Sequence, residues 1–194
     1  MADQPRILAF AGSLRADSYN KKLVKIAAHG ARIAGAEVTS MDLRDYPMPV
    51  FDEDVEAKEG LHPNARKLKD LFLSHHGLLI ASPEYNSSVS AVLKNAIDWV
   101  SRPSPGESPL QCFAEKVAVI MAASPGALGG LRGLVTLRSI LGNIKVIVLP
   151  DQLAIVKSHE AFNADGSLKD TKQQAAVEQL GAKLTGVLKR IHSS

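Results

Sequence analysis

The chain has 194 residues, of which 45% are hydrophobic and 22% are charged, with a formal net charge of +3 and a pI near 9.0. These values are close to the average for globular domains and exclude a disordered chain or a coiled coil. The basic residues are dispersed and not interleaved with aromatic ones, which argues against nucleic-acid binding. The single cysteine, Cys112, excludes an internal disulfide and a multi-cysteine metal site.

The N-terminal segment MADQPRILAF carries an acid where a signal peptide needs bases, and its apolar run is too short for one. No stretch of the chain approaches the roughly 20 apolar residues of a membrane span. We therefore expect a soluble protein of the cytoplasm.

Apolar runs and helical periodicity alternate along the chain. In chain order they predict a strand over 6–12, a helix over 20–33, a strand over 36–43, a helix over 64–76, a strand over 77–83, a helix over 90–102, a strand over 116–124, a helix over 129–143, a strand over 145–150 and a helix over 170–192. Prolines predict loops without regular structure over 46–54 and 102–110.

Five alternations of strand and helix, with mostly apolar strands, predict a parallel sheet covered by helices on both faces. No linker or internal repeat divides the sequence, so we expect one domain over 1–194. In such a sheet, ligands bind beyond the carboxyl ends of the strands, where the winding reverses. The loops after the first, third and fourth strands are therefore the candidate sites.

The first of these loops contains short hydroxyl side chains and one arginine. Ser13, Arg15, Ser18 and Asn20 surround the predicted start of a helix, where unpaired N–H groups favour an anion. The loop matches neither GxxxxGK[ST] nor GxGxxG. Its hydroxyls suit a terminal phosphate better than a pyrophosphate. The alternative interpretation is that Ser18 or Asn20 only caps the helix.

The other two loops offer a mixed polar and aromatic surface. Pro83, Glu84, Tyr85, Asn86 and Ser87 follow the third strand, and this mixture suits a planar heterocycle with polar edges. An ordinary turn before a helix capped by Ser88 or Ser90 is the alternative. The fourth-strand loop, 123–133, is rich in glycine, which permits either a close approach to a ligand or mere flexibility.

The segments GSLRADSYNKKL (12–23), SPEYNSSVSAVLKNAIDWVSR (82–102) and SPGALGGLR (124–132) resemble the NADPH-dependent FMN reductase family of flavodoxin-like proteins, which includes chromate and quinone reductases and azoreductases. The resemblance implies a five-stranded sheet in the order 2-1-3-4-5, bound FMN, NADPH or NADH as electron donor, and a homodimer or homotetramer. It implies that the phosphate loop and the two later loops bind the cofactor through Ser13, Leu14, Arg15, Ser18, Tyr19, Asn20, Pro83, Glu84, Tyr85, Asn86, Ser87, Ser124 and Gly126.

The sequence departs from the family pattern at two places. Ser87 stands where many members have glycine or an aromatic residue, and Ser90-Ala91 stands where many have Pro-Gly. The first departure affects the pocket over the flavin and the second the start of a helix. Trp99, near the end of that helix, predicts either an interface between subunits or a core position.

Other catalytic chemistries find little support in the sequence. There is no GxSxG motif, Cys112 has no evident base beside it, and the six histidines, His75 and His76 included, form no metal pattern. Lys94 and Asp98 are spaced as a surface ion pair. Flavin chemistry needs no acid–base residues because the cofactor carries the hydride.

We therefore expect an NAD(P)H oxidoreductase that works by a ping-pong cycle through FMN on a quinone, chromate or an azo compound, without a metal or a catalytic side chain. The alternatives are a flavodoxin-like electron carrier, a flavin-binding regulator without turnover, and a phosphate-ester enzyme on the same fold.

Overall fold

The computed structural model of the chain describes residues 4–191. Five parallel strands form one sheet in the order β2-β1-β3-β4-β5, which confirms the predicted doubly wound fold. The strands are β1 (Arg6–Ala11), β2 (Glu37–Ser40), β3 (Gly77–Ala81), β4 (Val117–Ala123) and β5 (Ile147–Ile155). The three central strands are almost entirely buried, as expected for a sheet with two covered faces.

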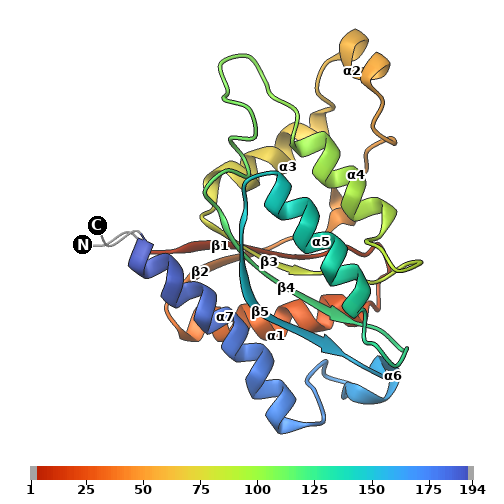
Figure 1. Cartoon of the computed structure of the whole chain (residues 1–194), viewed down its shortest axis with the longest axis vertical. Helices are drawn as coiled ribbons and strands as arrows, with labels where there is room; N and C mark the ends of the chain where they lie inside the picture. The colour runs from red at the N-terminus through yellow and green to blue at the C-terminus, as the bar shows by residue number, and fades with distance from the viewer. Residues whose placement is uncertain (1–3, 192–194) are drawn as a thin grey trace.

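Helices cover both faces of the sheet (Figure 1). One face packs against α1 (Tyr19–Ile33) and α7 (Thr171–Ile191), and the other against α3 (Pro63–Ser74), α4 (Ala91–Val100) and α5 (Leu131–Asn143). Each face of the sheet therefore has its own core cluster, and the helices on that face pack their apolar sides into it. The predicted end of the last helix, at 192, lies outside the described residues.

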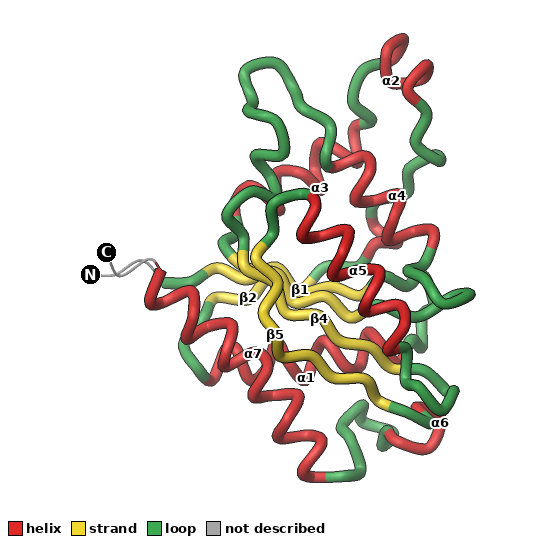
Figure 2. Tube along the Cα trace, viewed as in Figure 1, coloured by secondary structure: helices red, strands yellow, loops and turns green. Residues whose placement is uncertain are grey.

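Four elements differ from the sequence prediction. A short 3-10 turn, η1 (Leu43–Asp45), ends the predicted second strand early, and two short helices, α2 (Glu53–Glu59) and α6 (Ser158–Ala161), lie in segments predicted to be irregular or left unassigned. β5 continues past Pro150 because it is the edge strand and its register shifts between Ala118 and Ile120 of β4. Figure 2 shows α2 on a projection far from the sheet.

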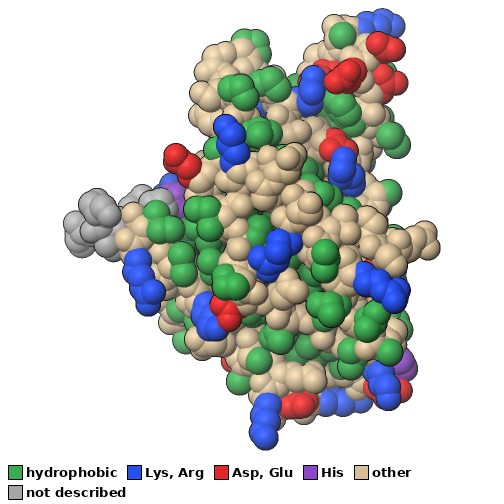
Figure 3. Space-filling model, viewed as in Figure 1, with side chains coloured by type: hydrophobic (Ala, Val, Ile, Leu, Met, Phe, Trp, Pro, Cys, Tyr) green, Lys and Arg blue, Asp and Glu red, His purple; other side chains and the backbone are tan. Residues whose placement is uncertain are grey.

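The surface of the face in Figure 3 carries lysines and arginines scattered among acidic and neutral side chains, without a continuous basic patch. Among the helices of the described part, residues 4–191, none has the length and apolarity needed to cross a membrane.

Candidate functional site

The loops predicted to form the site start side by side at one edge of the sheet. Ala11, Ala81 and Met121 are paired across β1, β3 and β4. The next residues continue this pairing, because the Gly12 amide donates to the Ala81 carbonyl at 2.9 Å and the Ser82 amide to the Met121 carbonyl at 2.8 Å. The parallel register therefore brings segments about 70 and 40 residues apart to one place.

The helix α4 packs directly on the start of the first loop. Ser90 caps α4 by accepting from the Leu93 amide at 3.3 Å, and its hydroxyl donates to the Gly12 carbonyl at 2.6 Å. A Cβ atom on Gly12 would lie 2.9 Å from the Leu93 side chain. Gly12 is therefore needed for this helix contact, because any side chain at this position would collide with Leu93.

The first loop leaves its hydroxyls and helix amides available to an anion. Ser18 is the N-cap residue of α1, but its side chain makes no capping hydrogen bond, so the capping interpretation is not supported for Ser18. Ser13 and Ser18 are both buried. Within residues 4–191, the one side-chain hydrogen bond found for Ser13 is the one that its hydroxyl accepts from the Arg15 amide, at 3.3 Å. The Arg15 guanidinium lies 6.0 Å from the centre of the Tyr19 ring.

Asn20 has a different environment from the serines. Its side-chain amide donates to the Ala123 carbonyl and accepts from the Ala123 amide, each at 2.9 Å. Both polar atoms of this buried side chain are thus bound to the end of β4. Asn20 fixes the first turn of α1 against the fourth-strand loop.

The loop after β3 makes a tight reverse turn. Tyr85 and Ser88 exchange backbone hydrogen bonds at 3.0 and 3.1 Å, and the two residues between them, Asn86 and Ser87, have φ values of 52° and 63°. Positive φ at both central positions is the geometry of a type I′ turn. This turn presents Tyr85 to solvent with 53% of its surface exposed.

Glu84 connects this turn to the start of α5. Its carboxylate accepts from the Gly133 amide, in the first turn of that helix, at 3.0 Å. The positive end of the helix dipole stabilises the negative charge there. Glu84 therefore acts mainly as a positioning residue that holds the turn.

The glycine-rich loop after β4 is shaped by its own chain. Gly129 and Gly130 have φ values of 63° and 99°. A Cβ on Gly129 would lie 2.9 Å from the backbone of β5, and one on Gly130 would lie 2.7 Å from Ala122. Neither flexibility nor ligand approach is needed to explain these glycines. Ser124 instead forms a small turn by accepting from the Gly126 amide at 3.3 Å.

The three loops enclose a cleft of about 70 Å³. Nine of the thirteen predicted residues line it, together with Ala123 and Pro125, which the sequence analysis did not select: the nine are Ser13, Arg15, Ser18, Tyr19, Asn20, Pro83, Glu84, Tyr85 and Ser124. Leu14, Asn86, Ser87 and Gly126 lie in the same loops but do not line the cleft. Ala123 and Pro125 carry no side-chain chemistry that could have indicated them.

The residues considered for other chemistries lie away from this cleft. Cys112 is fully buried and its thiol donates to the Val100 carbonyl at 3.2 Å, and burial raises its pKa to about 11. His75 is buried, and its ring forms a hydrogen bond of 2.8 Å with the Thr39 hydroxyl. Trp99 is a core residue whose indole donates to the Pro49 carbonyl at 2.8 Å. Lys94 and Asp98 form the predicted surface ion pair, at 2.7 Å.

Comparison with known proteins identifies relatives over most of the chain. Residues 5–160 match the family model described as NADPH-dependent FMN reductase. An NAD(P)H-dependent FMN reductase of Pseudomonas aeruginosa is 36% identical over 180 residues, which are 92% of each chain. A quinone reductase of Escherichia coli is 31% identical over 191 residues, 95% of this chain and 94% of the relative.

Solved structures support the same assignment. The flavoenzyme NAD(P)H:(acceptor) oxidoreductase FerB of Paracoccus denitrificans superposes with a TM-score of 0.78 at 27% identity, over 97% of this chain and 98% of that one. A flavodoxin from the Archaea superposes with a TM-score of 0.62 at 8% identity over 95% of this chain and 99% of that one, which shows the flavodoxin-like fold. The chain belongs to the NADPH-dependent FMN reductase family.

Proposed function

We propose that the chain binds FMN in the cleft between its three loops and uses it to transfer electrons from NADPH or NADH to a quinone or a similar small acceptor. The observation that carries the proposal is the cleft itself, which joins an anion-binding turn to an exposed aromatic residue. The family membership and the names of the relatives, which include FMN and quinone reductases, support it.

The phosphate of FMN would lie in the turn before α1. Ser13 and Ser18 supply hydroxyls, Arg15 supplies a fixed positive charge, and the first residues of α1, Tyr19 and Asn20, line the same cleft. This donor set fits a dianionic phosphate, which accepts several hydrogen bonds at once. A buried hydroxyl at Ser18 that caps nothing is accounted for by such a ligand.

The flavin ring would lie at the open rim of the cleft. A volume of about 70 Å³ is too small to enclose a tricyclic ring, because pockets that bury such ligands measure about 300 Å³ or more. Tyr85, with 53% of its surface exposed, stands at this rim, and the buried Pro83 lines the cleft beside it. When bound, FMN supplies the hydride chemistry. A ring at the rim stays accessible to a donor and then to an acceptor at the same position.

Steady-state kinetics on the FMN-loaded protein tests this proposal. We expect NADPH or NADH oxidation with a soluble quinone, and parallel lines in double-reciprocal plots, as a ping-pong cycle requires. An electron carrier would instead need a partner reductase for any turnover. Protein that is colourless as purified and cannot be reconstituted with FMN would overturn the proposal at its first step.

Chromate and azo compounds are further proposed acceptors, since both take electrons from an accessible reduced flavin. A homodimer or homotetramer is also proposed, on the family resemblance. Gel filtration of the FMN-loaded protein with light-scattering detection tests it, and a clean monomer would contradict it.

A further inference from the structure

A further cavity lies beside the proposed flavin cleft, where the first loop meets the loop after η1. Its volume is about 280 Å³, near the lower end of the range for small-molecule sites. Apolar and aromatic side chains make up most of its lining, which consists of Leu14, Leu43, Tyr46, Pro47, Met48 and Val92, with Arg44 and Asn95. This composition favours an apolar ligand.

Two polar side chains of the lining are already bound to other parts of the protein. Asn95 accepts from the Phe51 amide through Oδ1 and donates to the Pro49 carbonyl through Nδ2, each at 2.8 Å. Arg44 donates to Asp42 from Nε and Nη2, at 3.0 and 2.9 Å. An apolar ligand therefore leaves neither side chain without a hydrogen-bond partner.

The loop after η1 is held in place by side chains of two helices. Asn64 of α3 donates to the Pro47 carbonyl, and Trp99 of α4 donates to the Pro49 carbonyl, each at 2.8 Å. The Phe51 ring packs edge-on against Trp99, with the ring centres 5.1 Å apart. The loop has no regular secondary structure, but these contacts fix its backbone. The cavity is thus formed before a ligand arrives, which lowers the cost of binding.

Leu14 connects this cavity to the flavin cleft. Its chain neighbours Ser13 and Arg15 line the cleft, whereas Leu14 lines the cavity. Val92, also in the lining, lies in the first turn of α4, which begins shortly after the turn that presents Tyr85. A molecule at the rim beside Tyr85 therefore has an apolar cavity next to it.

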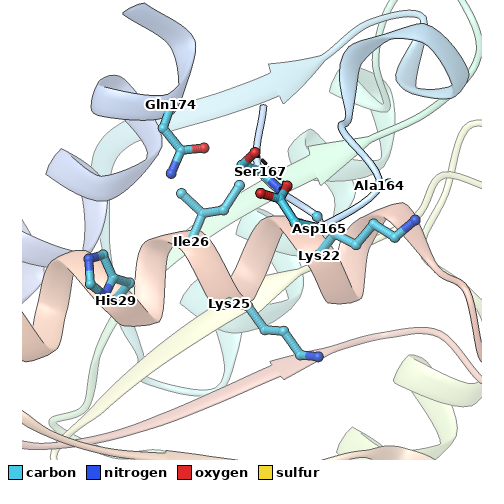
Figure 4. Close-up of a pocket in the computed structure, with 9 residues that line it drawn as sticks. Lys22, Lys25, Ile26, His29, Ala164, Asp165, Ser167 and Gln174 are labelled. Carbon is cyan, nitrogen blue, oxygen red and sulfur yellow. Dashed lines mark hydrogen bonds between the residues drawn. The ribbon is translucent and has the colours of Figure 1, made fainter. Parts of the chain in front are cut away.

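The hollow beside α1 in Figure 4 is unlike this cavity. The helix contributes Lys22, Lys25 and His29 to it. The turn across from the helix carries Asp165 and Ser167, whose side chains are hydrogen-bonded at 2.6 Å. An apolar group placed there would separate these charged groups from water at a cost in free energy. An apolar ligand therefore fits the cavity beside the flavin cleft better than this hollow.

We propose that the cavity beside Leu14 binds the apolar substituent of the electron acceptor, and that Met48 and Val92 limit the size of that substituent. The inference rests on the proposed function and names the acceptor class, a quinone with a short alkyl or prenyl side chain. The quinone ring stays at the rim, and its side chain extends past Leu14 into the cavity. Reduction to the hydroquinone takes two electrons and one proton from NAD(P)H and one proton from water, and it leaves the side chain unchanged.

The test compares Met48→Trp, which fills the cavity, with Val50→Trp in the FMN-loaded protein. Val50 lies on the same loop, is 84% exposed and does not line the cavity. The substrates are ubiquinone-0 and ubiquinone-1, which share one ring and differ by a prenyl group. We expect the wild type to favour the prenyl quinone about tenfold in kcat/KM, because the prenyl group leaves water. Met48→Trp abolishes this preference, and Val50→Trp leaves it unchanged.

A second variant fills the cavity from the opposite element. Val92→Phe enlarges a side chain of α4 that lines the cavity. Val135→Phe makes the same change at an exposed valine of α5 that does not line it. We expect Val92→Phe to lower the preference for the prenyl quinone and Val135→Phe to leave it unchanged. This pair keeps the proposal testable if Met48→Trp does not fold.

Calorimetric titration of the oxidised, FMN-loaded protein with ubiquinone-1, without a nicotinamide, measures binding apart from turnover. We expect about tenfold weaker binding in Met48→Trp than in the wild type. An unchanged preference and an unchanged affinity in both Met48→Trp and Val92→Phe would overturn the cavity assignment, while quinone reduction itself upheld the proposed function. Absence of any NAD(P)H oxidation, with ubiquinone-1 binding still weakened by Met48→Trp, would contradict the proposed function alone.

Two other groups are apolar enough to occupy the cavity, the methyl-substituted edge of FMN and a side chain of a second copy of this chain. Titration of the apoprotein with FMN and light scattering of the FMN-loaded protein distinguish them from the acceptor. Equal FMN affinity and equal mass in the wild type and Met48→Trp support the acceptor. Weaker FMN binding in Met48→Trp would assign the cavity to the flavin, and a changed mass would assign it to a subunit contact. Either result would overturn the proposal.

Discussion

Ser87 occupies a backbone conformation that favours glycine. Its φ is 63°, and for a residue with a Cβ atom this conformation costs about 1–2 kcal/mol. Its side chain makes one long contact, at 3.5 Å, with Arg132 Nη1. The residue that distinguishes this sequence from many members of its family thus stands where the turn geometry disfavours it.

We expect Ser87→Gly to raise the free energy of unfolding by about 1 kcal/mol, because glycine adopts a positive φ without the Cβ clash. Urea denaturation of both proteins measures the change. Asn86→Gly is the matched control at the neighbouring position of the turn, with φ 52°, and its gain is smaller because asparagine tolerates this region. An equal gain in both variants would contradict the explanation.

Glu84 is a second residue whose role follows from one contact. Glu84→Ala removes the hydrogen bond to the Gly133 amide, and we expect a loss of about 2 kcal/mol in unfolding free energy and weaker FMN binding. Glu84→Gln keeps an acceptor oxygen and loses only the charge, so its effects are intermediate. Denaturation and FMN titration measure the two effects. An alanine variant with unchanged stability and FMN affinity would contradict the positioning role.

Ser13, Arg15 and Ser18, which line the cleft, could be selected from the sequence because their polar chemistry is local. The role of Asn20 could not be predicted, since its partner Ala123 lies 103 residues away in the chain. The packing role of Gly129 and Gly130 could not be predicted for the same reason. Their neighbours belong to β5 and β4, and only the folded sheet brings them close.

The apolar pattern of the sequence predicted the helices and strands that pack into the core, but it did not predict the short helix α2 on the surface. α2 buries no residue, so it has no apolar periodicity. Its signals are at its ends, where Asp52 caps the first turn and Gly60, with φ 80°, ends the helix. The last strand was predicted to end at Pro150, but β5 continues to Ile155, because an edge strand with an irregular register accommodates a proline, which lacks an amide hydrogen.

The other end of the sheet contains a buried lysine at the start of β4. Lys116 is 7% exposed, and its ammonium donates to the His75 carbonyl. Burial lowers its pKa from 10.5 to about 8. Below pH 8 the lysine is charged in both the folded and the unfolded states, so the folded state bears the full cost of a buried charge. Between pH 8 and 10.5 the unfolded state binds more protons, and stability from this group rises with pH.

We expect Lys116→Met to remove this pH-dependent contribution. The difference in unfolding free energy between the variant and the wild type should fall by about 3 kcal/mol from pH 7 to pH 11, as the wild type recovers the cost. Taking the difference at each pH cancels the titrating groups that do not interact with Lys116, whereas Cys112 interacts with it electrostatically and does not cancel fully. Urea denaturation at several pH values measures it. A difference that stays constant across this range would show that Lys116 has an ordinary pKa.

For the whole molecule, the sheet topology accounts for the site. The Ser13–Asn20 turn, the Tyr85 turn and Ser124 come from three loops that meet only because β1, β3 and β4 are adjacent and end together. A ligand that bridges these loops therefore binds the folded state alone, and its binding free energy adds to the stability of the entire sheet.

We expect FMN at a hundred times its Kd to stabilise the protein by about 2.7 kcal/mol, which corresponds to a rise in Tm of about 5–10 °C for a chain of this size. Riboflavin at the same concentration shares the ring but lacks the phosphate, so its shift should be much smaller. Arg15→Ala should reduce the FMN shift toward that of riboflavin, because it removes the charge of the phosphate turn while leaving the Tyr85 loop intact. Thermal denaturation followed by circular dichroism gives all three values. Equal shifts for FMN and riboflavin would place the binding energy in the ring contacts and contradict the phosphate assignment of the Ser13–Asn20 turn.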